Sequence, residues 1–400
     1  MAVILKIAKS AKEIDDVFKL RHQSYVIEDG KFGGSALPGM RISDRFDALP
    51  VIANIIAYDG QTPVGTLRAN LDSSCGLPSE EYFDFSHYRE VVSQNFADKK
   101  EEVLIASGGM FAILEGWKNR RNIIYALLKL IIGVYHSWGV THVIATSNHE
   151  TVSIYKHLGF EELAEPVWVE EIGNSIVPMA ASFDKMYQWA FGKLLDTQLD
   201  DFWLQNFAEH FERVLLEPGE ILFEEGSGAS HAYIIDEGWV TISRKDPEGS
   251  ELTLATLPRG ELFGELALLD EGVRSGTTRA VNHTELIRFS RDEFLLCIKS
   301  NHKLVRKLLK SFSQRVRHAD ELAMVMAFAP QTGRIKHALN SLKNSAVPDR
   351  KRKNTKVVKM GPTEIAKSAG VREDEVRRVL EEEKLKGHID YGKKIIRFYD

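Results

Sequence analysis

The chain has 400 residues, which is more than one compact domain usually holds and suits two to four domains. An apolar fraction of 44% supports ordinary folded cores, and because no run of about 18 apolar residues occurs, no membrane span is expected. The two cysteines, Cys75 and Cys297, fall in different predicted domains and lack metal-ligand spacing. Neither a disulfide nor a metal site is therefore expected, and a cytoplasmic location fits this cysteine usage.

The net charge of −5 is unevenly distributed along the chain. Residues 329–400 contain 18 Lys and Arg against 10 Asp and Glu, a local charge of +8 that leaves −13 for the rest. A basic terminal segment on an acidic body is typical of a protein in which one domain meets a polyanion such as DNA. A solvated basic tail would give the same composition.

Residues 1–190 have the mixed pattern of an α/β domain. A hairpin is predicted at Asp59-Gly60, and Gly139 ends an apolar helix. Strands are predicted at residues 3–7, 51–58, 64–71, 103–114 and 142–146, helices at residues 11–27, 123–138 and 150–157, and a last strand with a connector at residues 173–198.

The end of this domain carries an informative motif. Residues 148–160 read Asn-His-Glu-Thr-Val-Ser-Ile-Tyr-Lys-His-Leu-Gly-Phe and resemble the closing motif of the GNAT acyltransferase fold. The resemblance implies that Tyr155 is the acid that protonates a leaving thiolate. Five residues further upstream have spacings similar to those of the acyl-homoserine-lactone and N-acyl amino acid synthase branch: Arg21, Tyr25, Asp44, Asp47 and Arg68. Members of that branch take acyl chains from acyl carrier protein or coenzyme A.

Two features depart from this branch. Residues 117–122 replace the usual glycine-rich pyrophosphate loop, so Arg120 and Arg121 are the candidates for holding the phosphates of the donor. Residues 106–110 lack the strand glutamate of the branch, so Asp44 or His149 would have to act as the base. The domain is predicted to be an N-acyltransferase that uses acyl-CoA or acyl carrier protein, or alternatively an acyl-ligand sensor or an inert scaffold.

Residues 200–298 change to a β-rich pattern. Glycine turns recur between short apolar runs, at Gly219, Gly226, Gly228, Gly238, Gly249, Gly260 and Gly264. Many short strands at such spacing indicate a β-sandwich or barrel.

The sharpest motif of the sequence runs from Phe263 to Ala280. Arg274 supplies a planar charged fork for a cyclic phosphodiester, Glu265 an acceptor for a ribose hydroxyl, and Gly264 a close backbone approach. Backbone N–H groups of a short helix and of a turn can cradle the same phosphate. The expected nucleotide contacts are Gly264, Glu265, Leu266, Arg274, Ser275 and Thr277.

This motif resembles, without a gap, the phosphate-binding cassette of cyclic nucleotide-binding domains. The resemblance covers about residues 200–328 and implies a β-roll (jelly roll) that binds cyclic AMP or another cyclic nucleotide. In the related bacterial cyclic-AMP receptors a Thr-Ser pair on a long helix contacts the base, whereas Ala319-Asp320 stands here. The identity of the base is therefore left open, and a cassette that has lost its ligand is the alternative.

Residues 301–328 are predicted to form one long helix, which Asn301 caps and Pro330 ends. Seven positions at alternating spacings of three and four form a heptad seam with one polar intrusion: Val305, Leu308, Phe312, Arg315, Ala319, Leu322 and Met326. The seam predicts a parallel homodimer, and a helix packed on its own β-domain is the alternative.

Residues 329–400 contain the spacing of a helix-turn-helix. Ala366 lets two helices close, Gly370 makes the turn, and Val376 locks the second helix. With the preceding domain, this segment resembles the cyclic-AMP receptor (Crp/Fnr) family of transcription regulators, which implies a winged helix-turn-helix. The expected DNA contacts are Arg372, Arg377 and Arg378 on the second helix and Lys393 on the wing. Residues 373–375 (Glu-Asp-Glu) depart from the usual start of that helix, although they could accept from cytosine.

The sequence thus predicts a multidomain α+β chain with a GNAT-like α/β domain at 1–190, a cyclic nucleotide-binding domain at 200–328 that includes the dimer helix, and a winged helix-turn-helix at 329–400. The predicted function is a cyclic-nucleotide-responsive, DNA-binding transcription regulator with a fused acyltransferase-like domain. The alternative is a cyclic-nucleotide-gated N-acyltransferase whose helix-turn-helix is vestigial or serves only protein packing.

Overall fold

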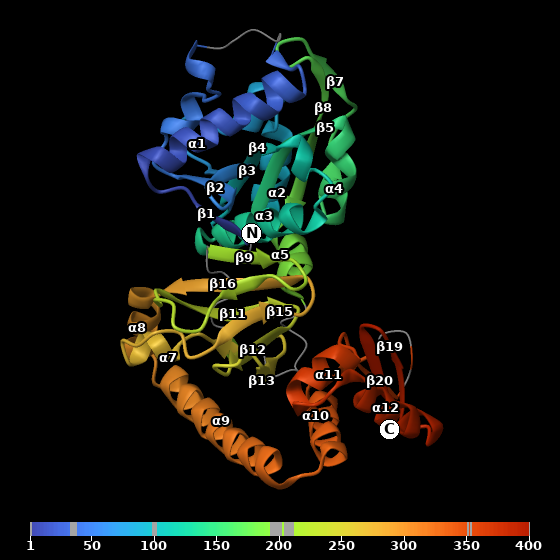
Figure 1. The fold of residues 1–400 in the computed structure, drawn as a ribbon. Helices are drawn as coiled ribbons and strands as arrows, with labels where there is room; N and C mark the ends of the chain where they lie inside the picture. The colour runs from blue at the N-terminus through green and yellow to red at the C-terminus, as the bar shows by residue number, and fades with distance from the viewer. Residues whose placement is uncertain are drawn as a thin grey trace. The chain divides into compact units, whose positions relative to one another are not determined.

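The computed structural model describes residues 2–32, 38–97, 102–192, 202–203, 212–349, 352 and 354–399. The chain divides into two compact units, Met1–Leu215 and Leu216–Asp400. Strands and helices occur in both units, so the chain is a multidomain α+β protein, as the sequence predicts (Figure 1).

The first unit is built on a mixed sheet with the strand order β9-β1-β2-β3-β4-β5-β8-β6, and β7 pairs with β8. The strands are β1 (Val3–Ile7), β2 (Ile52–Asp59), β3 (Thr62–Leu71), β4 (Ile105–Ile113), β5 (His142–Asn148), β6 (Glu161–Glu162), β7 (Val167–Val169), β8 (Asn174–Ser182) and β9 (Glu212–Leu216). The β4–β5 pair is parallel, whereas its flanking pairs are antiparallel. The centres of β2 and β3 are continuously buried, which indicates that both faces of the sheet are covered.

The helices of the first unit include α1 (Ala11–His22), α2 (Ser86–Ala97), α3 (Arg121–Ser137), α4 (Val152–His157) and α5 (Phe183–Phe191). Ser10 and Glu13 form a capping box that starts α1. The helix expected at residues 11–27 is α-helical only to His22 and continues as a π-helical turn, η1 (Gln23–Glu28). Such turns often occur at functional sites, and this one carries Tyr25.

The second unit begins with the β-rich segment that the sequence predicts. One sheet has the order β10-β15-β12-β13, and β11 pairs with β14 and β16. The elements are β10 (Ile221–Phe223), β11 (His231–Glu237), β12 (Val240–Lys245), β13 (Glu251–Leu257), β14 (Leu262–Phe263), α7 (Leu266–Leu269), β15 (Thr277–Ala280), β16 (Thr284–Ser290) and α8 (Arg291–Ser300). The turn at Gly238 requires glycine, because φ is +92° and a Cβ there would lie 2.5 Å from the carbonyl oxygen of His283.

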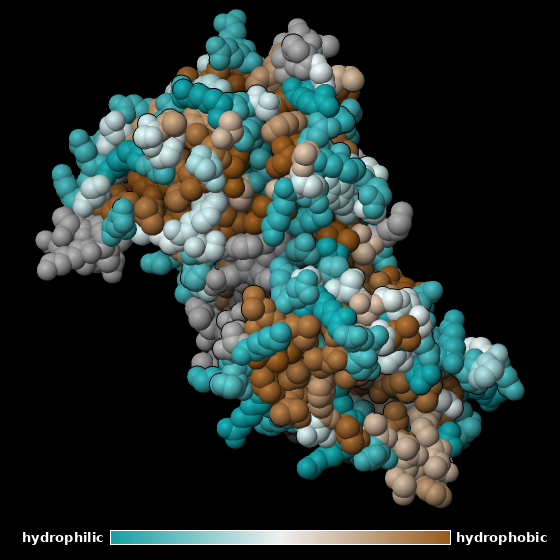
Figure 2. All heavy atoms as spheres, turned by 90° about the vertical axis from the view of Figure 1, so that its left-hand side faces the viewer, coloured by the Kyte–Doolittle hydropathy of each residue, from teal (hydrophilic) through white to brown (hydrophobic). Residues whose placement is uncertain are grey.

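The long helix α9 (His302–Phe328) follows, capped by the Asn301 side chain. The expected seam is wrong at two positions: Leu308 is buried within its own unit, and Arg315 forms an ion pair with Glu265. The neighbouring heptad row instead combines exposed and partly buried apolar residues, namely Val305, Leu309, Phe312, Val316, Ala319, Ala323 and Met326. Figure 2 faces the side on which Figure 1 draws α7, α8 and α9, and hydrophobic side chains gather on this side of the second unit.

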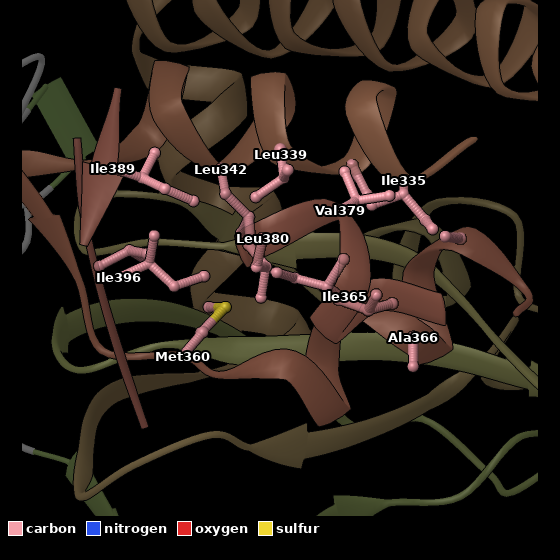
Figure 3. Close-up of a cluster of buried hydrophobic side chains, with 14 of the residues drawn as sticks. Ile335, Leu339, Leu342, Met360, Ile365, Ala366, Val379, Leu380, Ile389 and Ile396 are labelled. Carbon is pink, nitrogen blue, oxygen red and sulfur yellow. The ribbon is translucent and has the colours of Figure 1, made fainter. Parts of the chain in front are cut away.

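The rest of the second unit surrounds a second core, to which Trp239 of the β-rich segment also contributes (Figure 3). It comprises α10 (Gln331–Ser345), β17 (Val347–Pro348), β18 (Thr355–Val358), α11 (Pro362–Ala369), α12 (Glu373–Leu385), β19 (Ile389–Gly392) and β20 (Ile395–Tyr399). Ala366 and Val376 lie in this core, and Gly370 ends α11 in the left-handed conformation with φ of +60°. These three positions therefore have the places that the spacing predicts.

Candidate functional site

The nucleotide cassette occupies the connection from β14 through α7 to β15. Gly264 has φ of +76°, and a Cβ there would lie 2.8 Å from Nη1 of Arg274, so the position requires glycine. The buried Arg274 donates from Nη1 to the Gly264 carbonyl and from Nη2 to the His231 carbonyl, both at 2.7 Å. Its guanidinium carbon lies 4.1 Å from the centroid of the Phe223 ring. These contacts fix the charged fork in one orientation.

Glu265 is fully buried beside this arginine. Its Oε1 accepts a hydrogen bond from Nη1 of Arg315 at 2.5 Å, and Arg315 also donates to the Leu262 carbonyl. The second oxygen, Oε2, has no partner among the residues described. Burial raises the pKa of Glu265, and the charge of Arg315 opposes that shift. A buried carboxylate oxygen without a donor is suited to accept from a ligand hydroxyl.

A cavity of about 40 Å³ separates these groups. Small-molecule sites usually enclose about 300 Å³ or more, so a ligand of that size would fit only if lining side chains moved. Arg315, which belongs to α9, is one of these side chains.

Most of the predicted nucleotide contacts line this cavity: Gly264, Glu265, Leu266, Arg274 and Ser275. Thr277 does not line it, and its hydroxyl accepts a hydrogen bond from the Glu225 amide at 3.1 Å. The sequence interpretation missed Phe223, Thr278 and Arg315, which also line the cavity. Of these three residues, only Arg315 was noticeable in the sequence, because it is a polar residue in an otherwise apolar heptad row.

A second cavity, of about 490 Å³, lies in the first unit where β4 and β5 separate. The two strands pair from Ile105 with His142 to Gly108 with Ala145 and diverge beyond that point. Met110 in β4 has φ of +51°, next to a register shift with β3, which marks a β-bulge. We call this cavity the split cavity, and its volume is that of a small-molecule site.

Four charged side chains form a buried network at the split cavity. Asp47 accepts from Arg21 at 2.9 and 3.0 Å and from Arg68 at 3.0 Å, and Arg68 also donates to Asp44 at 2.6 Å. Burial alone would raise the pKa of Asp47, but the two guanidinium groups hold it below its usual value. Asp44 and Arg68 line the cavity, and Arg21 supports them through Asp47.

Tyr155 lines the split cavity together with Tyr25. Burial raises the pKa of Tyr155 to about 12, so its phenol stays protonated at neutral pH and can act as a proton donor. Asp44 also lines the cavity, with its carboxylate engaged by Arg68 and by the Phe46 amide. His149 lies on an exposed turn and does not line the cavity. The fold therefore brings Tyr155 and Asp44 to one site and leaves His149 outside it.

The predicted phosphate-holding residues lie at the start of α3. Arg120 precedes the helix and stacks on Trp117, with its guanidinium carbon 4.0 Å from the ring centroid. Lys118 is paired with Asp29 at 2.8 Å. The side chain of Arg121 lies outside the described residues.

The predicted DNA contacts on α12 are all paired with acidic residues near them in the sequence. Arg377 donates to Glu373 at 2.5 and 2.9 Å, and Arg378 to Glu375 at 2.8 Å. Arg372 pairs with Asp374 at 3.0 Å. Lys393 lies in the turn between β19 and β20.

A cross-segment contact connects α11 to the β-rich part of its unit. Lys367 on α11 pairs with Glu251 on β13 at 2.9 Å, and Ser243 donates to the same carboxylate at 2.7 Å. Hydrogen bonds from Ser243 and Lys367 lower the pKa of Glu251. The pair is partly exposed, so it contributes a modest and salt-sensitive attraction.

Comparison with known proteins matches residues 213–301 to the cyclic nucleotide-binding domain and residues 16–182 to the N-acyl amino acid synthase FeeM. The cyclic AMP receptor protein of Thermus thermophilus is 32% identical over 171 residues, which are 43% of this chain and 76% of that protein. The chain belongs to the cyclic AMP receptor family.

Other relatives match this chain over shorter spans. The cAMP-activated global transcriptional regulator CRP of Salmonella typhimurium is 34% identical over 122 residues, 30% of this chain and 58% of that protein. The curated relatives are thus spanned over about half to three quarters of their length. Similar solved structures include the c-di-GMP responsive regulator CLP of Xanthomonas campestris (21% identity, TM-score 0.40, 49% of this chain and 98% of that chain). FeeM from uncultured soil microbes is another (13% identity, TM-score 0.37, 48% and 97%).

The described residues of the chain contain no helix long and apolar enough to cross a membrane. Within the same residues, no group of three or more His, Cys, Asp or Glu side chains is placed to hold a metal ion.

Proposed function

We propose that this chain is a homodimeric, cyclic-nucleotide-responsive transcription regulator of the cytoplasm with an N-acyltransferase domain at its N-terminal end. The observation that carries the proposal is Glu265, a fully buried carboxylate with one oxygen bound to Arg315 and the other without a partner among the described residues. An unsatisfied buried acceptor is unfavourable in the ligand-free protein, and a ribose 2′-hydroxyl would satisfy it.

Nucleotide binding would use two groups of the cassette. The ribose hydroxyl would donate to Oε2 of Glu265, and the cyclic phosphate would meet Arg274, whose Nε also lacks a partner among the described residues. The amides around Ser275 would complete the phosphate site. A charged guanidinium and a buried carboxylate together select a ligand that carries an anion next to a hydroxyl group.

The response would pass through α9. A nucleotide that enters the cavity displaces Arg315, which breaks the bonds from this helix to Glu265 and to the Leu262 carbonyl. The helix ends at Phe328, one residue before Ala329-Pro330, and α10 and the helix-turn-helix follow. A shift of α9 would therefore change how α11 is held on β13 by Lys367 and Glu251.

The dimer contact would be the exposed apolar row of α9. Leu309 and Val316 are each 60% exposed, although they are large apolar residues at heptad spacing. If a second copy of this helix packed against it in parallel, the exposed apolar row of each copy would cover that of the other. Two copies would also present two helix-turn-helix segments to one DNA duplex.

DNA binding would require the arginines of α12 to change partners. Arg377 and Arg378 are bound to Glu373 and Glu375 on their own helix, so phosphate or guanine must compete with these carboxylates. We therefore expect binding that is weak at high salt and selective for sites where the acidic residues can accept from cytosine N4.

In the N-terminal domain, the acyl donor would enter the split cavity with its thioester near Tyr155. The acceptor amine would attack the thioester carbonyl carbon, the C–S bond would break, and Tyr155 would give its proton to the departing thiolate. Asp44 faces the same cavity and would take the proton of the attacking amine. Arg120 and Arg121 would hold the donor phosphates.

Calorimetry with cyclic AMP and cyclic GMP, followed by a gel shift with random DNA, tests the regulator. We expect saturable binding of one nucleotide and tighter DNA binding in its presence. A thiol-release assay with acyl-CoA and acyl carrier protein donors, offered amino acids and amines, tests the acyltransferase separately. No nucleotide binding would refute the first part, and donor binding without thiol release would identify the domain as a sensor.

A second function is favoured by the acidic start of α12. If the three carboxylates at residues 373–375 prevent DNA binding, the chain would be an N-acyltransferase gated by cyclic nucleotide. That function predicts thiol release that changes with nucleotide, together with no gel shift in either state.

A further inference from the structure

One buried hydroxyl in the first unit is not used by the proposed reaction. Tyr135 lies near the end of α3 and is 1% exposed. Its phenol oxygen has no hydrogen-bond partner among the described residues. The ring packs against Trp138, with the centroids 6.3 Å apart, a contact that a phenylalanine would make equally well.

A buried hydroxyl without a partner lowers the stability of the fold, because it gives up its bonds to water and gains none in return. Burial also raises the pKa of Tyr135 far above its usual value, so the group stays neutral and keeps its proton. The Tyr135 hydroxyl can therefore donate a hydrogen bond to an acceptor that a ligand brings. A ligand that brings an acceptor would remove the energetic penalty.

The surroundings of the hydroxyl indicate where such an acceptor would lie. The phenol oxygen of Tyr135 is 3.0 Å from the position that a Cβ would take at Gly108. Gly108 lines the split cavity, and it is the last residue of β4 that pairs with β5. The hydroxyl thus lies against the backbone of β4 at the point where the two strands part, and the absence of a side chain at Gly108 makes room for it there.

The same point is close to the proposed proton donor. Tyr155 and Gly108 both line the split cavity. Tyr155 comes from α4, whereas Tyr135 comes from α3, is not among the lining residues and places its hydroxyl next to Gly108. A thioester that meets Tyr155 would therefore carry its neighbouring carbonyl groups past Gly108.

We infer that the Tyr135 hydroxyl binds the acyl donor, by donating a hydrogen bond to a carbonyl oxygen of the thioester-linked chain where it passes Gly108. This inference rests on the proposed acyltransferase function and adds a positioning residue to it. Tyr135 holds the donor, whereas Tyr155 supplies the proton. The two tyrosines should therefore affect different kinetic constants.

The test uses the full chain with Tyr135→Phe, and Tyr125→Phe as the matched control on the exposed part of the same helix. Calorimetry with dodecanoyl-CoA measures donor affinity, thiol release measures KM and kcat, and thermal unfolding measures stability. We expect Tyr135→Phe to weaken donor binding and raise KM by about 3- to 10-fold, as the loss of one neutral hydrogen bond does. Its unfolding temperature should be unchanged or higher, and Tyr125→Phe should match the wild type.

A purely structural hydroxyl would give the opposite pair of results, a lower unfolding temperature and an unchanged donor affinity, and would overturn the inference. Failure of the proposed function looks different, since the wild-type protein itself would then neither bind nor cleave the donor. Tyr155→Phe separates the two roles further: it should lower kcat with little change in donor affinity. Equal donor affinity in wild type and Tyr135→Phe, with turnover intact, refutes this inference alone.

Discussion

Arg274→Ala removes the charged fork of the nucleotide cassette, and its effect can be worked out from the contacts of that side chain. The buried guanidinium donates to two backbone carbonyls, those of Gly264 and His231, at 2.7 Å each. Hydrogen bonds from a charged donor contribute about 1.5–3 kcal/mol each, so we expect the free energy of unfolding of this unit to fall by about 3–6 kcal/mol.

The loss of nucleotide affinity is a separate quantity. Without Arg274, a cyclic phosphate that has displaced Arg315 would be partly buried with no charged donor lining the cavity, which costs about 2–4 kcal/mol. That cost corresponds to a dissociation constant about 30- to 700-fold higher. Arg274→Lys keeps the charge but not the planar fork, so its affinity should lie between those of Arg274→Ala and the wild type.

Calorimetry at fixed ionic strength, with circular dichroism to verify that each variant is folded, measures both effects. Arg279→Ala is the matched control, because Arg279 donates to the Gly219 carbonyl at 2.7 Å and does not line the cavity. A folded Arg274→Ala protein that binds nucleotide as tightly as the wild type would refute the assignment of the cassette.

Three further predictions concern other contacts. Leu309→Asp with Val316→Asp should give monomers by light scattering, because charges would enter the apolar row of α9; a persistent dimer would point to another surface. Glu251→Gln removes the charged partner of Lys367 and so weakens the attachment of α11 to β13. DNA binding without nucleotide should then tighten by about 2- to 5-fold in a gel shift, as expected for a partly exposed pair. Unchanged binding would contradict the idea that this ion pair restrains α11. Burial alone would raise the pKa of Glu13, but the ion pair with Lys6 and the hydrogen bonds of the helix cap lower it to about 2 from 4.5. Because the folded value is the lower one, this stabilisation is present above about pH 5 and is lost as the pH falls toward 2. Glu13→Gln should therefore lower the free energy of unfolding by about 1 kcal/mol at pH 7 and by much less near pH 2.5, and equal losses at both pH values would disprove this account.

The amino-acid sequence by itself determined the features whose parts lie close together in the chain. The nucleotide cassette is one continuous stretch, so Gly264, Glu265 and Arg274 could be placed from their spacing. The turn between α11 and α12 is equally local: Gly370 is left-handed, and Ala366 and Val376 on either side of it are buried in one core. Composition and glycine spacing also indicated the change from an α/β segment to a β-rich one.

The tertiary structure alone decided which side chains meet across long stretches of chain. Two heptad rows of α9 have acceptable spacing, and periodicity cannot choose between them, because the choice depends on which row the β-rich segment buries. The ion pair of Arg315 with Glu265 joins residues that are 50 positions apart in the chain. The contact of Phe223 with Arg274 joins β10 to the loop between α7 and β15. In the first unit, the hydroxyl of Tyr135 reaches Gly108 from a different element of the fold. Sequence pattern gives the face of a helix or strand that will be buried, whereas the partner on that face is set by how the elements pack.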